Sequence, residues 1–234
     1  MQELSMHILD VAQNSLDAGA TRIEIVIVED LPSDKLTIRI TDNGRGMSQD
    51  IVAKVLDPFY TTRTTRRVGL GLPLFAAAAQ DCDGDLKIES TEGQGTTVVA
   101  TFQHSHIDRA PLGDMKSTLM SIIMSEHPCD LHYVHQLHSL AQGKMDCRGG
   151  THPANRHPEK RELREAKLCS QDVQPKRAFE FNTADIKREL ACPPLFPPAC
   201  GGMEGEGINI PLSHPAVREW LAEFITEGEA SLQA

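Results

Sequence analysis

The first eighteen residues follow a helical pattern of apolar and polar positions. Over residues 2–18, apolar side chains recur every three or four positions, which predicts an α-helix with one buried face: Leu4, Ile8, Leu9, Val11, Ala12 and Leu16. The polar side chains of the same segment share that spacing and therefore form one stripe: His7, Asp10, Asn14 and Asp17. Such a stripe is either a solvated face or one wall of a binding site.

The period then changes to two, which is typical of strands. Residues 22–30 and 35–42 alternate between apolar and polar side chains and are separated by a turn at residues 31–34, so they predict an antiparallel hairpin with its apolar face on the helix. Gly19 suits the left-handed position just after the helix. A second hairpin is predicted from residues 85–90 and 96–103.

Asp42 lies at the predicted end of its strand, directly before a glycine-rich loop. A carboxylate in that place can accept a hydrogen bond from an exocyclic amine. Gly44 and Gly46 follow, and two glycines allow backbone to approach a flat ring closely. The combination suits adenine.

Another pair of glycines precedes a predicted helix. Gly69 and Gly71 stand before an apolar run that begins at Leu72 and carries Pro73 in its first turn. Free N–H groups and the helix dipole at such a terminus attract phosphate. The segment is neither GxGxxG nor a P-loop, so the two common nucleotide motifs are excluded. Gly93 and Gly95, by contrast, fit a plain β-turn equally well.

Taken in order, these segments resemble the N, G1, G2 and G3 boxes of the Bergerat-fold ATPases. The matching residues are N14, D42-x-G44-x-G46, G69-x-G71 and G93-x-G95-T96. That superfamily joins gyrase, the ninety-kilodalton heat-shock chaperone, MutL-type repair proteins and histidine kinases. The segment QNSLDAGATRIEI is similar to MutL, whereas DPFYTTR followed by VGLGL is similar to histidine kinases. We identify the chain most closely with stand-alone histidine-kinase-like ATP-binding proteins.

The resemblance implies a fold and a set of roles. The fold would be α+β, a two-layer α/β sandwich with a mixed sheet and helices on one face. Asn14 would coordinate Mg²⁺, Asp42 would hold the adenine amine, and residues 57–68 would form a lid over ATP. The remaining cofactor contacts would come from Gly44, Gly46, Arg63, Arg67, Gly69, Gly71, Leu72 and Thr96. Arg63, Arg66 and Arg67 could equally be a surface charge cluster.

One position departs from the hydrolysing members of the superfamily. They carry Glu four residues before the Asn, where it orients or deprotonates water, and here that place holds Asp10. A carboxylate displaced by roughly 1 Å can cost about a hundredfold in rate. We therefore expect slow turnover, or binding without turnover, with Asp10 as the candidate catalytic residue.

Composition narrows the possible partners and the compartment. The chain has 234 residues and a net charge of −10, which argues against nucleic acid as the main partner. It has no apolar run of spanning length and no signal-peptide pattern, so we expect a cytoplasmic protein without membrane contact. Six cysteines occur without a C-x-x-C pair and are expected to be free thiols.

The second half of the chain predicts a small α/β module. We place the ATP-binding domain at residues 1–103, the start of the module at 104–138, a polar insertion at 139–176 and the rest of the module at 177–234. Helices are expected at residues 112–126 and 183–190 and, after an N-cap at Ser213, through Trp220, Phe224 and Ile225. Strands are expected at residues 131–135 and 179–181.

Histidines in this half invite two further hypotheses. His127, Cys129, His132, His135 and His138 are dense enough to suggest a metal site. His132 and His135 would however face opposite sides of a strand, which favours a coincidental group. The segment SHIDRAPL resembles the phosphoacceptor box of histidine kinases, with His106 as acceptor. It follows the last strand of the domain instead of preceding the domain on a helical hairpin, so a linker histidine is the default interpretation.

The sequence therefore predicts an ATP- and Mg²⁺-binding protein that transfers phosphoryl groups to a protein partner in trans. The alternative is an ATP-dependent switch or slow ATPase without kinase activity, and the two hypotheses differ in what Asp10 does. A MutL-like repair ATPase would need a long transducer domain, for which this chain is too short.

Overall fold

A computed structural model describes residues 3–56, 71–127, 129–139, 177–191 and 211–233 of the chain. The order of its elements is α1 (Leu4–Asp17), β1 (Arg22–Asp30), β2 (Lys35–Asp42), α2 (Gln49–Val52), α3 (Gly71–Gln80), β3 (Asp85–Thr91), β4 (Gly95–Gln103), α4 (Met115–Ile123), β5 (Asp130–His138), β6 (Arg177–Asn182), α6 (Thr183–Ala191) and α7 (Pro215–Gln233). The helices and strands expected from the sequence in these ranges are all present.

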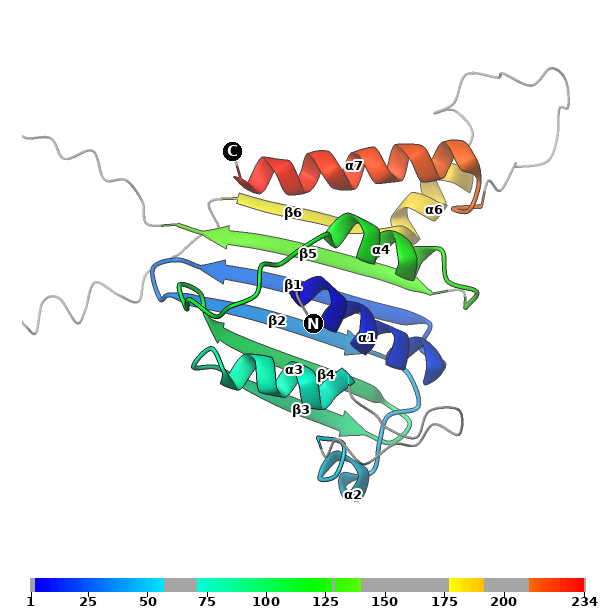
Figure 1. The fold of residues 1–234 in the computed structure, drawn as a ribbon. Coiled ribbons are helices and arrows are strands. Elements are labelled where there is room, and N and C mark those ends of the chain that lie inside the picture. Colours follow the sequence, from blue (N-terminus) through cyan, green and yellow to red (C-terminus); the bar gives the residue numbers. More distant parts are fainter. Residues whose placement is uncertain (1–2, 57–70, 128, 140–176, 192–210, 234) are drawn as a thin grey trace, which may run out of the picture.

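One mixed sheet of six strands organises the molecule, in the order β3-β4-β2-β1-β5-β6. Strands β1 and β2 pair antiparallel as the predicted hairpin, and β3 and β4 form the second hairpin. Strand β1 pairs parallel with β5, which makes the sheet mixed. The helices α1, α3 and α4 lie on one face of this sheet, and α7 runs along its β6 side (Figure 1). The predicted α+β two-layer architecture is confirmed.

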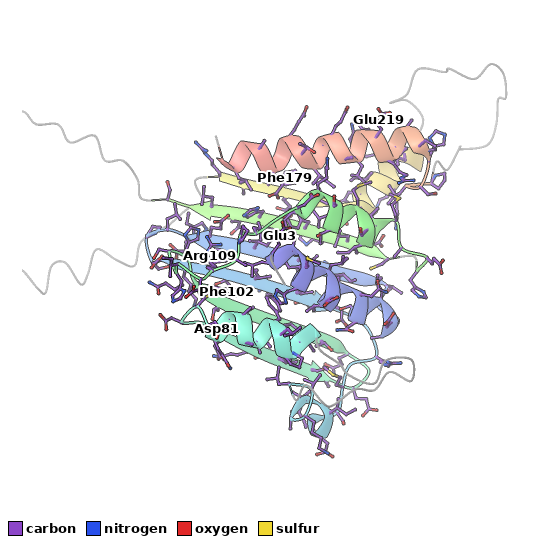
Figure 2. The ribbon with its side chains drawn as sticks, in the orientation of Figure 1. Glu3, Asp81, Phe102, Arg109, Phe179 and Glu219 are labelled. Atoms are coloured by element: carbon purple, nitrogen blue, oxygen red, sulfur yellow. The ribbon has the colours of Figure 1, made fainter. Side chains whose placement is uncertain are left out.

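The core lies between the sheet and the helices because side chains alternate along each strand. Ile23, Ile25 and Ile27 of β1 are fully buried, and the residues between them are half-buried on the other face. Phe102 on β4 and Phe179 on β6, both labelled in Figure 2, carry the same buried layer towards the two edges of the sheet.

The strands of the second half extend the first sheet. All nine residues of β5 are in register with β1, from Arg22 opposite Asp130 to Asp30 opposite His138. The expected C-terminal module thus shares its sheet and its core with the ATP-binding part. The domain boundaries that we placed in the chain stay a prediction, and residues 140–176 of the expected insertion lie outside the described residues.

The chain after β4 also completes the first turn of α1. The backbone N–H groups of Leu4 and Ser5 donate to the carbonyls of Pro111 and Leu112 at 3.0 and 2.8 Å. Such N–H groups have no partner inside their own helix. The segment before α4 therefore stabilises the start of the helix that carries Asp10 and Asn14.

Helix α7 packs on β6 through a glycine. A methyl group at Gly228 would lie 2.1 Å from the ring of Phe179, so only a residue without a side chain allows this approach. The helix begins at Pro215, and the carbonyl of His214 accepts from the N–H of Arg218. The residue before the first turn is thus His214, and the expected N-cap at Ser213 is wrong by one position.

Candidate nucleotide-binding site

The polar residues of helix α1 divide between the core and the surface. His7, which the sequence placed on the polar stripe, is only 3% exposed, and its ring stacks on Phe75 of α3 with centroids 5.0 Å apart. Burial lowers the pKa of His7, so the ring is neutral at neutral pH. Asp10 and Asn14 stay half-buried, and Asp17 is exposed. His7 is therefore a core residue, contrary to the interpretation of the stripe as one surface.

Asp10 lies directly against the start of α3. A methyl group placed on Gly71 would sit 3.5 Å from Oδ2 of Asp10, at ordinary contact distance. One turn earlier in α1, His7 packs on Phe75, which lies one turn after Gly71 in α3. The two helices therefore run antiparallel. The tertiary structure thus brings the candidate catalytic carboxylate to the helix terminus at which the sequence places the phosphates.

Asp42, at the end of β2, has a fixed orientation. Its Oδ2 accepts a hydrogen bond from the Ser15 hydroxyl at 2.8 Å, and its Oδ1 accepts one from the Gly44 N–H at 2.8 Å. The residue is half-buried and leaves lone pairs for a further donor. Asp42 thus contacts α1 at Ser15, five positions after Asp10 on the same helix.

The glycines of the loop after β2 let it pack against the turn between β3 and β4. A methyl group at Gly46, where φ is +65°, would lie 2.0 Å from the carbonyl oxygen of Thr91, and one at Gly95, where φ is +115°, would lie 2.0 Å from that of Asp42. The N–H of Gly93 donates to the carbonyl of Arg45 at 2.7 Å. These contacts make the second hairpin a support for the Asp42 loop.

A small hydroxyl network continues this support. Ser90 Oγ donates to the Gly95 carbonyl at 3.0 Å and accepts from the Met47 N–H at 2.8 Å. Thr96 Oγ1 lies 2.9 Å from Ser90 Oγ, and Thr96 is the register partner of Asp42 across β2 and β4. The contact between Ser90 and Thr96 thus joins β3 to the residue that faces Asp42.

The remaining residues of the predicted set divide into two groups. Leu72, in the first turn of α3, is half-buried and packs against the core, and Asn14 lies on α1 one turn after Asp10. Arg63, Arg66, Arg67, Gly69 and the predicted lid, residues 57–68, lie outside the described residues.

The histidine hypotheses can be compared with the described residues. His132 lies within ion-pair distance of Glu24 and Glu180 on the open face of the sheet, and His135 is buried on the helix face, so the two point to opposite sides as expected. Within the described ranges no group of three or more His, Cys, Asp or Glu could hold a metal ion. Cys82 and Cys129 are free thiols, and the other four cysteines lie outside those ranges.

His106 lies at the wrong end of the sheet for transfer within one molecule. It follows β4, whose nine residues begin beside Asp42 and run to the other edge of the core. At roughly 3.3 Å per residue, His106 is about 25 Å from the Asp42 end. Its ring instead accepts from the N–H of Asp108 at 3.2 Å.

An ionic cluster around the buried His135 occupies this opposite end. His135 Nε2 lies 2.9 Å from Glu29 on β1, and His135 Nδ1 lies 3.0 Å from Glu229 on α7. Tyr133 donates to Glu229 at 2.7 Å, and His104 lies 2.7 Å from the other oxygen of Glu29. Two carboxylates facing both ring nitrogens require an imidazolium, so the cluster is an ionic link between the sheet and α7.

Two residues of the site were not identified from the sequence, Ser15 and Ser90. Each is buried, and each bonds to a residue that was identified. A serine inside an otherwise apolar helical face is the one signal that could have drawn attention to Ser15. Nothing local distinguishes Ser90 from any strand serine.

Comparison with known proteins assigns this half of the chain to a class. Residues 2–106 match the family described as histidine kinase-, DNA gyrase B-, and HSP90-like ATPase. With the fold and the ordered boxes, this match places residues 2–106 in the superfamily of Bergerat-fold ATPases.

Several curated proteins are similar to this chain, and two of those given below are named as kinases. The chain is 30% identical over 94 residues to sporulation kinase C of Bacillus subtilis, covering 40% of this chain and 22% of the relative. It is 34% identical over 95 residues to the sensor protein kinase WalK of Staphylococcus haemolyticus, covering 38% and 16%. It is 32% identical over 97 residues to the non-motile and phage-resistance protein of Caulobacter vibrioides, covering 39% and 12%. The chain thus spans less than a quarter of the length of these curated relatives.

Proposed function

We propose that this protein binds ATP with Mg²⁺ and transfers the γ-phosphoryl group to a side chain of a protein partner. The observation that carries the proposal is the position of α1, which puts Asp10 at the Gly71 terminus of α3 and the Ser15 hydroxyl on Asp42. One helix thus connects a terminus suited to phosphates with a carboxylate suited to an amine.

The residues present fit a magnesium ion. Asn14 lies on α1 one turn after Asp10 and offers an amide oxygen, the kind of ligand that Mg²⁺ prefers. Mg²⁺ takes few protein ligands when it is bound together with phosphates, so one side chain suffices. When bound, the ion would offset the negative charge of the triphosphate.

The geometry favours transfer in trans. An acceptor nucleophile must attack the γ-phosphorus while the bond to the β–γ bridging oxygen breaks and ADP leaves. His106 lies at the far end of β4 and cannot approach a nucleotide held by Asp42 and Gly71 in its own molecule. The position of His106 therefore supports an acceptor on another chain. We place the reaction in the cytoplasm, where ATP is supplied. Among the described helices, none is long and apolar enough to cross a membrane.

The second candidate is an ATP-dependent switch, favoured by the Asp that replaces Glu at position 10. Incubation of the protein with γ-labelled ATP, alone and with candidate partner proteins, separates the two. We expect label on a partner, dependent on Mg²⁺ and lost in Asn14→Ala, which should fold because Asn14 is not a core residue. Label found only on ATP would favour the switch. Unchanged Mg²⁺-dependent ATP binding in Asn14→Ala would contradict the assignment of Asn14.

A further inference from the structure

The Ser15 hydroxyl contacts the carboxylate proposed to recognise the nucleotide base. Ser15 is 4% exposed, and its Oγ lies 2.8 Å from Asp42 Oδ2 and 3.2 Å from the carbonyl oxygen of Val11, one helical turn earlier. A hydroxyl has one proton, and the shorter contact to a charged acceptor is the stronger bond. The Ser15 hydroxyl therefore donates to the Asp42 carboxylate, which is 27 positions away in sequence.

This bond and the Gly44 N–H together hold both oxygens of Asp42. A carboxylate held at one oxygen can rotate about its last side-chain bond, whereas one held at both cannot without losing a bond. Asp42 then presents its remaining lone pairs, which can only accept, in one fixed direction.

We infer that Ser15 is a positioning residue for base recognition: it locks Asp42 so that the site selects a base with an amine at its six-position over one with a carbonyl there. The inference rests on the proposed binding of ATP. An amine donates to fixed acceptors, while a carbonyl oxygen placed against them leaves polar groups unpaired and is rejected. Ser15 contacts Asp42 and not the base, so it acts through that carboxylate.

Comparison of ATP with inosine triphosphate tests this directly, because the two bases differ at the six-position and the adjacent ring nitrogen. Equilibrium binding is measured for wild type, Ser15→Ala and Ser5→Ala, with inorganic tripolyphosphate as a probe of the phosphate end alone. Ser5→Ala is the matched control, since Ser5 is also a buried serine of α1 but lies at its other end and contacts Glu3.

We expect Ser15→Ala to weaken ATP binding by about tenfold, the value of one hydrogen bond to a charged group. Binding of inosine triphosphate should change less than about twofold and tripolyphosphate not at all, so the preference for ATP shrinks. On an Asp42→Asn background the same change should cost nothing more, because the residue it positions is no longer a carboxylate. Ser15→Cys keeps the size with a weaker donor and should fall between.

An equal loss for both nucleotides, or no loss for either, would overturn the inference and leave ATP binding intact. A wild-type protein that binds neither ATP nor tripolyphosphate would overturn the proposed function, and this inference with it. If Ser15→Ala lowers the melting temperature, Ser15→Cys carries the test: an unchanged preference for ATP in that variant and in Asp42→Asn would refute the role of Ser15.

Discussion

At the scale of single residues, the chemistry of the site depends on the length of one side chain. Asp10 abuts the first residue of α3, so its carboxylate faces the place proposed for the phosphates. It is one methylene shorter than the Glu that the superfamily resemblance leads one to expect. A general base that is too far from its water loses much of its effect, even when its direction is right.

Lengthening this side chain is therefore expected to speed hydrolysis. Asp10→Glu should raise ATP turnover by about tenfold to a hundredfold without tightening ATP binding, because it improves the position of the base and not the hold on the ground state. Asp10→Asn should remove the residual turnover. Steady-state phosphate release measures both, and Asp17→Asn, an exposed carboxylate on the same helix, is the matched control. Undiminished turnover in Asp10→Asn would show that Asp10 is not the base.

At the scale of elements, the site is a junction of α1, the start of α3 and the loops at one end of the sheet. Its glycines serve different purposes. Gly46 and Gly95 have positive φ and touch backbone of neighbouring segments, so they maintain the fold around Asp42. Gly71 has space for a methyl group, and the three atoms nearest to that methyl all belong to Asp10. Of these three glycines, Gly71 is the one that can be changed without straining the protein itself.

Gly71→Ala is thus expected to separate binding from folding. The added methyl meets Asp10 at ordinary contact distance in the protein alone but would stand where the phosphates are proposed to lie. ATP affinity should fall at least about tenfold while the melting temperature stays within roughly 2 °C, because alanine suits a helix start better than glycine. Calorimetric titration and thermal unfolding give the two values. Gly46→Ala, in contrast, should lower the melting temperature sharply. Full ATP affinity in Gly71→Ala would remove α3 from the phosphate site.

At the scale of the whole molecule, the two halves of the chain are joined by the parallel β1–β5 pairing and by the ionic cluster under α7. Burial alone would lower the pKa of His135, but its bonds to Glu229 and Glu29 outweigh burial and raise that pKa to about 9. The bond from His135 lowers the pKa of Glu29 to about 2 in spite of burial. The folded state thus favours the charged form of both groups.

The sign of these shifts fixes the pH dependence of stability. For His135 the pKa is raised above its unfolded value of 6.5, so its contribution is complete below pH 6.5 and is lost as the pH rises through about 9. For Glu29 the pKa is lowered below 4.5, so its contribution is complete above pH 4.5 and is lost as the pH falls through about 2. Both shifts reflect the same bond between His135 and Glu29, so their contributions to the free energy of unfolding do not add.

We therefore expect the free energy of unfolding to decline between pH 7 and 9.5 by on the order of 1–3 kcal/mol. Urea unfolding at a series of pH values measures this. Glu229→Gln removes one carboxylate from His135 and should flatten the decline. Glu227→Gln, an exposed carboxylate on the same helix, should leave it unchanged. A decline of equal size in Glu229→Gln would show that His135 is not its source.

The sequence by itself determined the elements and the class of this protein. Apolar periods of 3.6 and two residues placed α1 and both hairpins, because these patterns depend only on neighbours along the chain. Asn14, Asp42 and the paired glycines are likewise local features, and their order along the chain resembles the four boxes of the Bergerat-fold ATPases. The ATP-binding class is what that resemblance implies.

Only the tertiary structure decided which side chains meet. Ser15 reaches Asp42, His7 turns into the core under Phe75, and Asp10 touches Gly71, because of the way α1 lies on the sheet beside α3. The register of β5 beside β1 likewise made one sheet of two expected parts and put His135 between Glu29 and Glu229. Contacts between residues far apart in sequence depend on packing, and no local pattern encodes them.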